Sequence, residues 1–418
     1  MHHFHYKKNE LHCEEVPLQK IAEEVGTPTY VYSSATFGRH FRVFDAAFQG
    51  ISHLTCFAMK TNSNIALLRA VSKWGGGVDI VSGGELFRAL TAGVPAHRIV
   101  YSGVGKTEAE MEYALRSDIL LFNVESADEL LTLANVAKRI GQRAPVAIRV
   151  NPDINPKTHP YISTGLKKSK FGIQIKESLK LYEASKKYDS LIIRGVSCHI
   201  GSQITQLKPF IDTVRRLRDF VQLLKQKGFD IQYIDLGGGL GIPYKNETPP
   251  SPAQYAGALK KELKDMRITL LLEPGRVIAG NAGILLTRLL YRKKQGNKNF
   301  VIVDAAMNDL IRPALYGSYH EILPVKKRGG RKERVNVVGP VCESADFFAE
   351  NRPLPVLPAN ELLSIMSAGA YGFTMASNYN SRLRAAEVLV HGNEFYVVRQ
   401  REEYKDLLKG EHVPKFLV

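Results

Sequence analysis

Residues 54–101, LTCFAMKTNSNIALLRAVSKWGGGVDIVSGGELFRALTAGVPAHRIVY, contain the pattern that decides the fold. Three short apolar runs end near Met59, Ile80 and Tyr101, and the amphipathic segments Ile65–Lys73 and Glu85–Ala92 lie between them. A short apolar run followed by apolar residues at helical spacing is typical of a strand that leads into a helix. Because parallel strands need such a crossover between them, the repeat predicts a parallel sheet.

The same alternation continues along the chain as far as Leu272. Five further apolar runs bring the number to eight, and they end near Phe122, Val150, Cys198, Leu236 and Leu272. Eight strand–helix units close into a TIM (β/α)8 barrel, which is the predicted fold. The connection 151–172 is long and rich in Pro, Gly and Lys. We expect it to form a flap on the face where barrel enzymes keep their binding loops.

Strand-like runs and turns without a regular helical interval follow Arg276 and predict a second, β-rich domain of sandwich-like or barrel-like form. The extended run Pro28–Tyr32 precedes the first barrel strand, and we expect it to complete this domain. The barrel is therefore assigned to residues 33–275, and the second domain to residues 1–32 with 276–418. Its strands are expected at Leu285–Tyr291, Phe300–Asp304, Val335–Val338 and Phe395–Arg399.

The composition is that of a soluble globular protein with two domains. Of its 418 residues, 44% are hydrophobic and 23% are charged, which allows a large core. No segment reaches the roughly 18 uninterrupted apolar residues of a membrane span, so no membrane partner is expected. Four cysteines lie far apart without CxxC spacing, which indicates the reduced cytoplasm. No metal is predicted, because His2, His3 and His5 lie in a terminus expected to be frayed.

The net charge of +16 is distributed over the chain. Local basic clusters occur at Lys167, Lys168 and Lys170 and at 326–334, and no stacking aromatic residues interleave with them. We therefore predict no nucleic-acid partner. The positive potential is expected instead to attract anionic small molecules.

Polar residues at the strand ends indicate the chemistry, since barrel enzymes react at the C-terminal ends of their strands. Lys60 follows the first strand, where partial desolvation favours the free amine and makes it a candidate for Schiff-base formation. A lysine that starts a helix and reaches solvent is the commoner alternative for Lys60 taken alone. Asp79 and Ser202 occupy the ends of the second and sixth strands.

Two loops are candidates for a phosphate site. Gly237, Gly238 and Gly239 follow the seventh strand, and Gly275 with Arg276 follows the eighth. Barrels frequently bind phosphate with the loops after these two strands, because glycine lets backbone N–H groups approach an anion closely. A tight turn is the alternative explanation of the glycine run.

Glu273 and His199 extend this site toward a pyridoxal phosphate cofactor. A carboxylate at the end of the eighth strand is placed to pair with a protonated pyridine nitrogen and maintain the ring as an electron sink. His199 leaves an apolar strand, where it either stacks on the ring or is a satisfied core residue.

Several motifs follow one another along the chain: FAMKTN (57–62), YSGVGK (101–106), NVES (123–126), HPYISTG (159–165) and GPVCESAD (339–346). In this order they resemble motifs of the fold-type III pyridoxal-phosphate enzymes, the alanine racemase-like barrels that include the class 2 ornithine, lysine and arginine decarboxylases. Among these the resemblance is to the diaminopimelate decarboxylases. It implies that Lys60 carries the cofactor as a Schiff base, that His199 stacks on the ring and that Glu273 contacts the pyridine nitrogen.

The same resemblance gives roles to residues of the second domain. It implies that Cys342 is the proton donor and reaches the cofactor of the neighbouring subunit, in a homodimer with shared active sites. Tyr371 matches a tyrosine that contacts the cofactor phosphate and the substrate. The residues implied to hold the far end of the substrate are Arg276, Arg312, Tyr316 and Glu343.

The implied reaction is decarboxylation of meso-2,6-diaminopimelate to L-lysine and carbon dioxide, the last step of lysine biosynthesis. Two arginines suit the carboxylate of the centre that does not react. The alternatives are a related decarboxylase of arginine, ornithine or carboxylated polyamines, and a non-catalytic homologue that binds pyridoxal phosphate. Glu273 counts against a racemase, which gains little from a strong electron sink.

Overall fold

The computed structural model describes residues 2–155 and 170–417. The motif 159–165 and most of the predicted flap 151–172 lie outside these residues. The chain divides into two compact units, one of residues 38–279 and one of residues 1–37 with 280–418.

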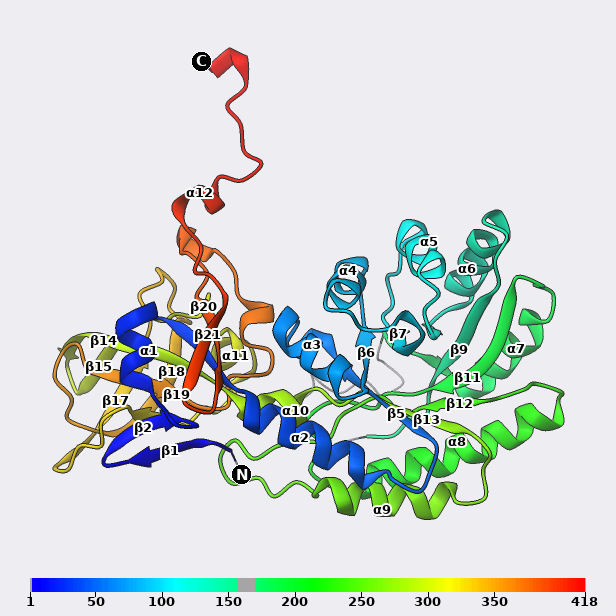
Figure 1. Ribbon diagram of the computed structural model, residues 1–418, viewed down its shortest axis with the longest axis horizontal. Helices are drawn as coiled ribbons and strands as arrows, with labels where there is room; N and C mark the ends of the chain where they lie inside the picture. The colour runs from blue at the N-terminus through cyan, green and yellow to red at the C-terminus, as the bar shows by residue number, and fades with distance from the viewer. Residues whose placement is uncertain (1, 156–169, 418) are drawn as a thin grey trace. The chain divides into compact units, whose positions relative to one another are not determined.

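The unit 38–279 is a closed barrel of eight parallel strands (Figure 1), which confirms the predicted TIM barrel. Each strand pairs with the next in parallel, and the last pairs with the first. A short additional strand, β10 (Ile173–Gln174), pairs with the fifth. The barrel strands are β5 (His53–Ala58), β6 (Gly77–Ile80), β7 (Ile99–Tyr101), β8 (Leu121–Val124), β9 (Ala144–Asn151), β11 (Leu191–Ser197), β12 (Tyr233–Asp235) and β13 (Thr269–Leu272).

Four helices of the barrel begin at a hydroxyl side chain that caps their first N–H groups. Ser82, Thr107, Ser126 and Ser251 each accept a hydrogen bond from a backbone N–H of the first turn, which otherwise has no partner within the helix. The helices are α2 (Ser34–Ala47), α3 (Ile65–Lys73), α4 (Gly83–Thr91), α5 (Glu108–Arg116), α6 (Ala127–Arg139), α7 (Ile175–Ser185), α8 (Lys208–Gln226), α9 (Pro252–Leu263) and α10 (Arg276–Ala279).

The second unit is rich in β-structure, as predicted. Its main sheet has the order β18-β17-β15-β14-β4-β20-β21, and β19 joins β14 to β16. The N-terminal strand β4 (Thr29–Ser33), formed by the extended run before the barrel, lies between β14 and β20 in this sheet. The other strands are β14 (Gly283–Gln295), β15 (Lys298–Val303), β16 (Ile322–Pro324), β17 (Lys332–Val338), β18 (Phe347–Pro355), β19 (Leu362–Ile365), β20 (Ala386–His391) and β21 (Glu394–Arg399).

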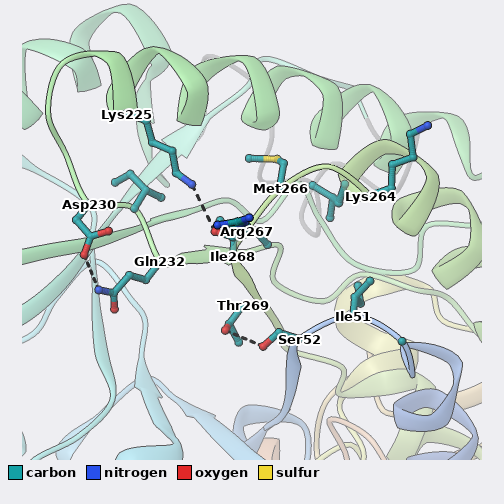
Figure 2. Close-up of a pocket in the computed structure, with 13 residues that line it drawn as sticks. Ile51, Ser52, Lys225, Asp230, Gln232, Lys264, Met266, Arg267, Ile268 and Thr269 are labelled. Carbon is teal, nitrogen blue, oxygen red and sulfur yellow. Dashed lines mark hydrogen bonds between the residues drawn. The ribbon is translucent and has the colours of Figure 1, made fainter.

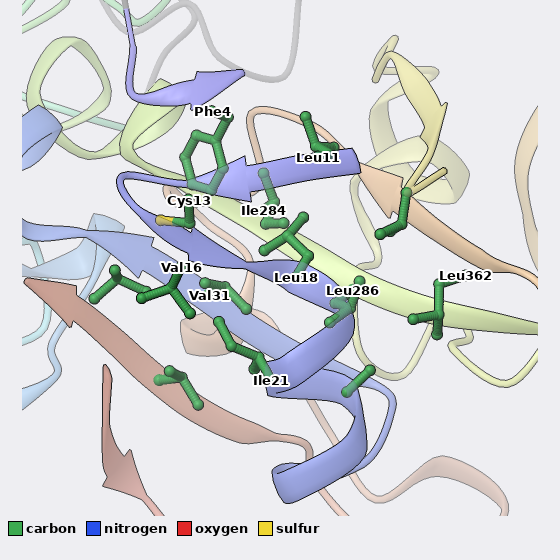
Figure 3. Packing of buried hydrophobic residues seen from close by; sticks show 14 of the residues in the cluster. Phe4, Leu11, Cys13, Val16, Leu18, Ile21, Val31, Ile284, Leu286 and Leu362 are labelled. Atoms are coloured by element: carbon green, nitrogen blue, oxygen red, sulfur yellow. The ribbon is translucent and has the colours of Figure 1, made fainter. Parts of the chain in front are cut away.

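The first residues of the chain belong to the core of this unit, so the expectation of a frayed terminus is wrong. Strand β1 (Phe4–Lys7) pairs with β2 (Glu10–Cys13), and β2 pairs with β3 (Val16–Pro17). Phe4 and Leu11 are buried with residues of α1 (Leu18–Val25), β4 and β14 (Figure 3), and this burial offsets the entropy cost of ordering the terminus. The remaining helices are α11 (Arg312–Tyr316) and α12 (Tyr404–Leu407).

Within residues 2–155 and 170–417, no helix combines the length and the apolar composition needed to cross a bilayer.

Candidate active site

Lys60 lies at the mouth of the barrel and pairs with a buried carboxylate. Strand β5 ends at Ala58, and a single 3₁₀ turn, Met59–Thr61, carries Lys60. Its Nζ donates to Oδ2 of Asp79 at 2.5 Å; the Lys60 side chain is 36% exposed and that of Asp79 is fully buried. Within the described part of the chain, Oδ1 of Asp79 has no hydrogen-bond partner. Asp79 therefore orients the lysine nitrogen, and the Lys60 side chain stays partly exposed.

Glu273 belongs to a buried polar network at the ends of four strands. Ser102 donates through Oγ to Oε1 of Glu273 at 3.1 Å, and Nδ2 of Asn123 donates to Oδ2 of Asp235 at 2.6 Å. Burial raises the pKa of Glu273 well above its usual range, and the charges of Asp235 and Asp79 raise this pKa further. Burial also raises the pKa of Asp235, which is hydrogen-bonded to Glu273. The two carboxyl groups therefore share a proton rather than ionise together.

His199 presents a neutral imidazole at the same mouth. Its Nδ1 accepts from the N–H of Gly238 at 3.2 Å, which assigns the ring proton to Nε2. Burial lowers the pKa of His199 well below its usual range, and the nearby charges of Arg149 and Lys60 act in the same direction. Because Lys60 also acts on Glu273, the lysine, the histidine and the carboxyl pair share one site.

Two of the three glycines after β12 donate backbone hydrogen bonds to side chains of the site, which the sequence did not predict. The N–H of Gly237 donates to Oδ1 of Asp235 at 2.9 Å, as that of Gly238 does to His199. A Cβ on Gly237 would lie 2.6 Å from Nδ1 of His199, in a backbone with φ of +64°. An anion at this loop therefore competes with two side chains for two of the three N–H groups. The loop also builds the site by letting backbone and ring approach closely.

Arg276 and Ser202 are brought together, as their places at strand ends suggest. Nη2 of Arg276 donates to Oγ of Ser202 at 3.0 Å, and its Nη1 donates to the hydroxyl of Tyr244 at 2.7 Å. Arg276 is buried, so these bonds fix the plane of its guanidinium. Gly275 lets this turn pack on the turn of Lys60, since a Cβ there would lie 2.3 Å from Cγ2 of Thr61.

The remaining predicted residues lie in the second unit. Arg312 and Tyr316 are the first and last residues of α11, and Arg312 is buried. Cys342 and Glu343 lie in the turn between β17 and β18, where Cys342 is exposed and its N–H donates to Oδ1 of Asn380 at 2.7 Å. Tyr371 follows β19 in a left-handed conformation, with φ of +57°.

The turn that carries Cys342 is anchored by Asp346. Its Oδ1 accepts from the N–H of Met307 and its Oδ2 from that of Val341, both at 2.7 Å. A buried carboxylate with two backbone donors holds the turn in a defined conformation.

Four residues of the barrel site were given no role from the sequence. Ser102, Asn123 and Asp235 obey the same rule as the predicted residues, since each is polar and lies at or next to the end of a strand. That signal was available for all three. Tyr244 lies in the long loop after β12, where no pattern indicates a contact with Arg276.

A cavity of about 690 Å³ is lined by other residues; Figure 2 shows its lining. Its lining includes Ser52, Gln232 and Thr269, which lie at the amino ends of β5, β12 and β13. It is thus at the opposite end of the barrel from Lys60. Several of its polar side chains bond to one another or to backbone, as between Ser52 and Thr269 at 2.9 Å, and none of the predicted site residues lines it.

Comparison with protein families gives a match over more than half of the chain. The model described as "Pyridoxal-dependent decarboxylase, pyridoxal binding domain" matches residues 34–280.

Individual relatives match over almost their whole length. The diaminopimelate decarboxylase of Vibrio cholerae is 49% identical over 415 residues, which is 99% of both chains. Among solved structures, diaminopimelate decarboxylase from Helicobacter pylori complexed with L-lysine has a TM-score of 0.91 at 41% identity and covers 94% of this chain and 98% of its own. The enzyme from M. jannaschii in co-complex with L-lysine has a TM-score of 0.94 at 39% identity and covers 99% of both.

Proposed function

The chain belongs to the pyridoxal-dependent decarboxylases, and among them to the diaminopimelate decarboxylases. We propose that it converts meso-2,6-diaminopimelate to L-lysine and carbon dioxide with pyridoxal phosphate held on Lys60. The observation that carries this proposal is the pair of Lys60 and buried Asp79 at the barrel mouth. Relatives that share about half of the sequence favour this substrate over arginine, ornithine or carboxylated polyamines. The reaction is the last step of lysine biosynthesis.

The barrel residues fit the cofactor. The amine of Lys60 is the group that can hold it covalently, and buried Oδ1 of Asp79 is left as an acceptor beside that amine. Glu273 offers a buried carboxyl group to the ring nitrogen, and Gly275 with Arg276 offers donors to the phosphate. When bound, pyridoxal phosphate supplies an electron sink for the bond pair that remains after carbon dioxide leaves.

Glu273 is proposed to keep the ring nitrogen protonated. A cation next to a buried carboxyl group favours its ionised form, so the negative charge shared with Asp235 moves toward the ring. Ser102 holds Oε1 in place by its hydrogen bond. The neutral ring of His199 covers one face without adding a positive charge.

The second unit is proposed to contribute the substrate-binding residues and the proton donor. Arg312, Tyr316 and Glu343 hold the amino and carboxylate groups of the centre that does not react, together with Arg276. The thiol of Cys342 would donate a proton to the reacting carbon of the substrate, and Tyr371 would contact the phosphate of the bound cofactor. The barrel unit, 38–279, binds the cofactor.

We further propose a cytoplasmic homodimer in which Cys342 completes the site of the neighbouring subunit. Its exposure supports this proposal, because an exposed thiol is accessible to a neighbouring subunit. Tyr404, Leu408 and Phe416 of the C-terminal segment are 78%, 64% and 84% exposed, and such exposed apolar side chains are candidates for contacts between chains. All four cysteines are free thiols, which supports a reducing compartment.

Replacement of Arg312 by alanine is expected to lower kcat/KM for meso-diaminopimelate. The expected loss of transition-state stabilisation is roughly 2–4 kcal/mol, because the substitution removes a buried partner of the substrate carboxylate. Steady-state kinetics measure the change. Arg288→Ala is a control, because Arg288 belongs to the same unit and its Nη1 bonds to the carbonyl of Asn360 at an exposed position. An unchanged specificity constant in Arg312→Ala contradicts the proposed role.

Mixing two inactive variants tests the shared sites. Lys60→Ala and Cys342→Ala each lack one half of the site, and random re-pairing gives mixed dimers with one native site, so about one quarter of wild-type activity is expected to return. Activity is measured before and after dissociation and reassembly of the mixture. No recovery contradicts sharing between subunits, and full turnover by Cys342→Ala alone contradicts its role as proton donor.

A further inference from the structure

His320 lies beside Arg312 in a single defined protonation state. The histidine is fully buried; its Nδ1 lies 2.8 Å from the carbonyl oxygen of Met366 and its Nε2 lies 3.1 Å from Nη1 of Arg312. A carbonyl oxygen only accepts, so Nδ1 carries the proton. Nε2 then has a lone pair and accepts from the guanidinium. A doubly protonated ring is unable to make the second bond, so His320 is neutral.

The chain returns to Arg312 after α11 and places two neutral acceptors, Ser318 and His320, at its guanidinium. Gly317 ends the helix with φ of +60°, a conformation that favours glycine, and the reversal brings Ser318 and His320 back to the helix start. Nη2 of Arg312 donates to Oγ of Ser318 at 3.2 Å. Neither Ser318 nor neutral His320 places a negative charge next to the arginine, in contrast to a carboxylate partner.

His320 is itself held from two sides. Met366, after β19, fixes the ring through its carbonyl, and Nη1 of Arg352 donates to the backbone oxygen of His320 at 2.8 Å. The guanidinium of Arg352 lies over the ring of Tyr319 at 4.1 Å. The ring therefore has little freedom to turn away from Arg312.

We propose that His320 is a positioning residue that sets the plane of the Arg312 guanidinium for bidentate binding of the substrate's far carboxylate. The inference rests on the proposed function of Arg312 and adds to it the device that selects an amino acid with a second carboxylate. Bidentate pairing is sensitive to the plane of the fork, so loss of one fixed acceptor weakens carboxylate binding.

Two substitutions separate this role from mere filling of space. The amide nitrogen of asparagine in His320→Asn takes the place of Nδ1 and keeps the bond to Met366, but the side chain is too short to reach Arg312. The amide oxygen of glutamine in His320→Gln takes the place of Nε2 and keeps the bond to Arg312, at the expense of the bond to Met366. We expect His320→Asn to raise KM for meso-diaminopimelate by about tenfold, with a smaller change in kcat, and His320→Gln to recover most of the loss.

Inhibition by two small amines tests whether the effect concerns the carboxylate. L-Lysine carries the same far carboxylate as the substrate, and cadaverine (1,5-diaminopentane) lacks it. His320→Asn is expected to weaken inhibition by L-lysine by about tenfold and to leave inhibition by cadaverine unchanged. Equal weakening of both inhibitors overturns the proposal, as does equal damage by asparagine and glutamine or an unchanged KM in His320→Asn.

His12→Asn is the matched control. His12 is also buried in this unit and its Nδ1 lies 2.9 Å from the carbonyl oxygen of Glu10, but it belongs to β2. The KM of the His12→Asn variant for meso-diaminopimelate is expected to equal that of wild type. Arg312→Ala is measured in parallel. An unchanged KM in Arg312→Ala refutes the proposed role of Arg312 itself. A raised KM in Arg312→Ala together with an unchanged KM in His320→Asn refutes only the proposed role of His320. Melting temperature and cofactor absorbance confirm that each holoenzyme is folded.

Discussion

Lys60→Ala is expected to reduce turnover of meso-diaminopimelate on the order of 10⁴-fold or more, because it removes the amine that holds the cofactor and leaves Asp79 as an unpaired buried carboxylate. The absorbance of cofactor bound to lysine should disappear at the same time. Both are measured on the purified variant with added pyridoxal phosphate.

The control for this variant is Lys73→Ala. Lys73 is an exposed lysine in the last turn of α3, in the same unit, and its loss should leave both turnover and absorbance intact. If Lys60→Ala keeps more than a few per cent of wild-type turnover, Lys60 is not the residue that holds the cofactor.

Glu273→Gln is expected to reduce kcat by roughly 10²-fold to 10³-fold. The substitution preserves the shape of the side chain and an acceptor for Ser102, but it removes the negative charge that balances a protonated ring nitrogen. Stopped-flow and steady-state kinetics on the holoenzyme measure the loss.

Ser102→Ala provides the comparison for the charge. It deletes the hydrogen bond to Oε1 at 3.1 Å and leaves the Glu273 carboxyl group in place, so a loss of about tenfold or less is expected. If Ser102→Ala is as damaging as Glu273→Gln, the network acts through its hydrogen bonds and not through the charge of Glu273.

Much of the barrel was predictable because its pattern is local. The alternation of short apolar runs with amphipathic segments located all eight strands, and α3 has the bounds predicted for it. Once the strands are placed, the rule that barrel chemistry lies at their carboxyl ends selects Lys60, Asp79 and Glu273. The same rule selects Asp235, but a carboxylate that bonds to another carboxylate is recognised only when the distances are known.

The second unit was predictable in class but not in detail. Its texture indicates strands, whereas the order of those strands depends on contacts between distant parts of the chain, such as β4 with β14 and β20. The run FHYK (4–7) illustrates the same limit. The histidines near it suggested a frayed end, but Phe4 is buried against residues far along the chain, and this burial orders the run as a strand. The roles of Cys342 and Arg312 came from family resemblance, since no local pattern distinguishes them from core or surface residues.

The most direct test of the central claim is the reaction itself. Purified protein with pyridoxal phosphate and meso-diaminopimelate should release carbon dioxide and L-lysine in equal amounts, and it should leave arginine and ornithine unchanged. Absence of both products, with the cofactor bound, would contradict the assignment and indicate a binding protein without catalytic activity.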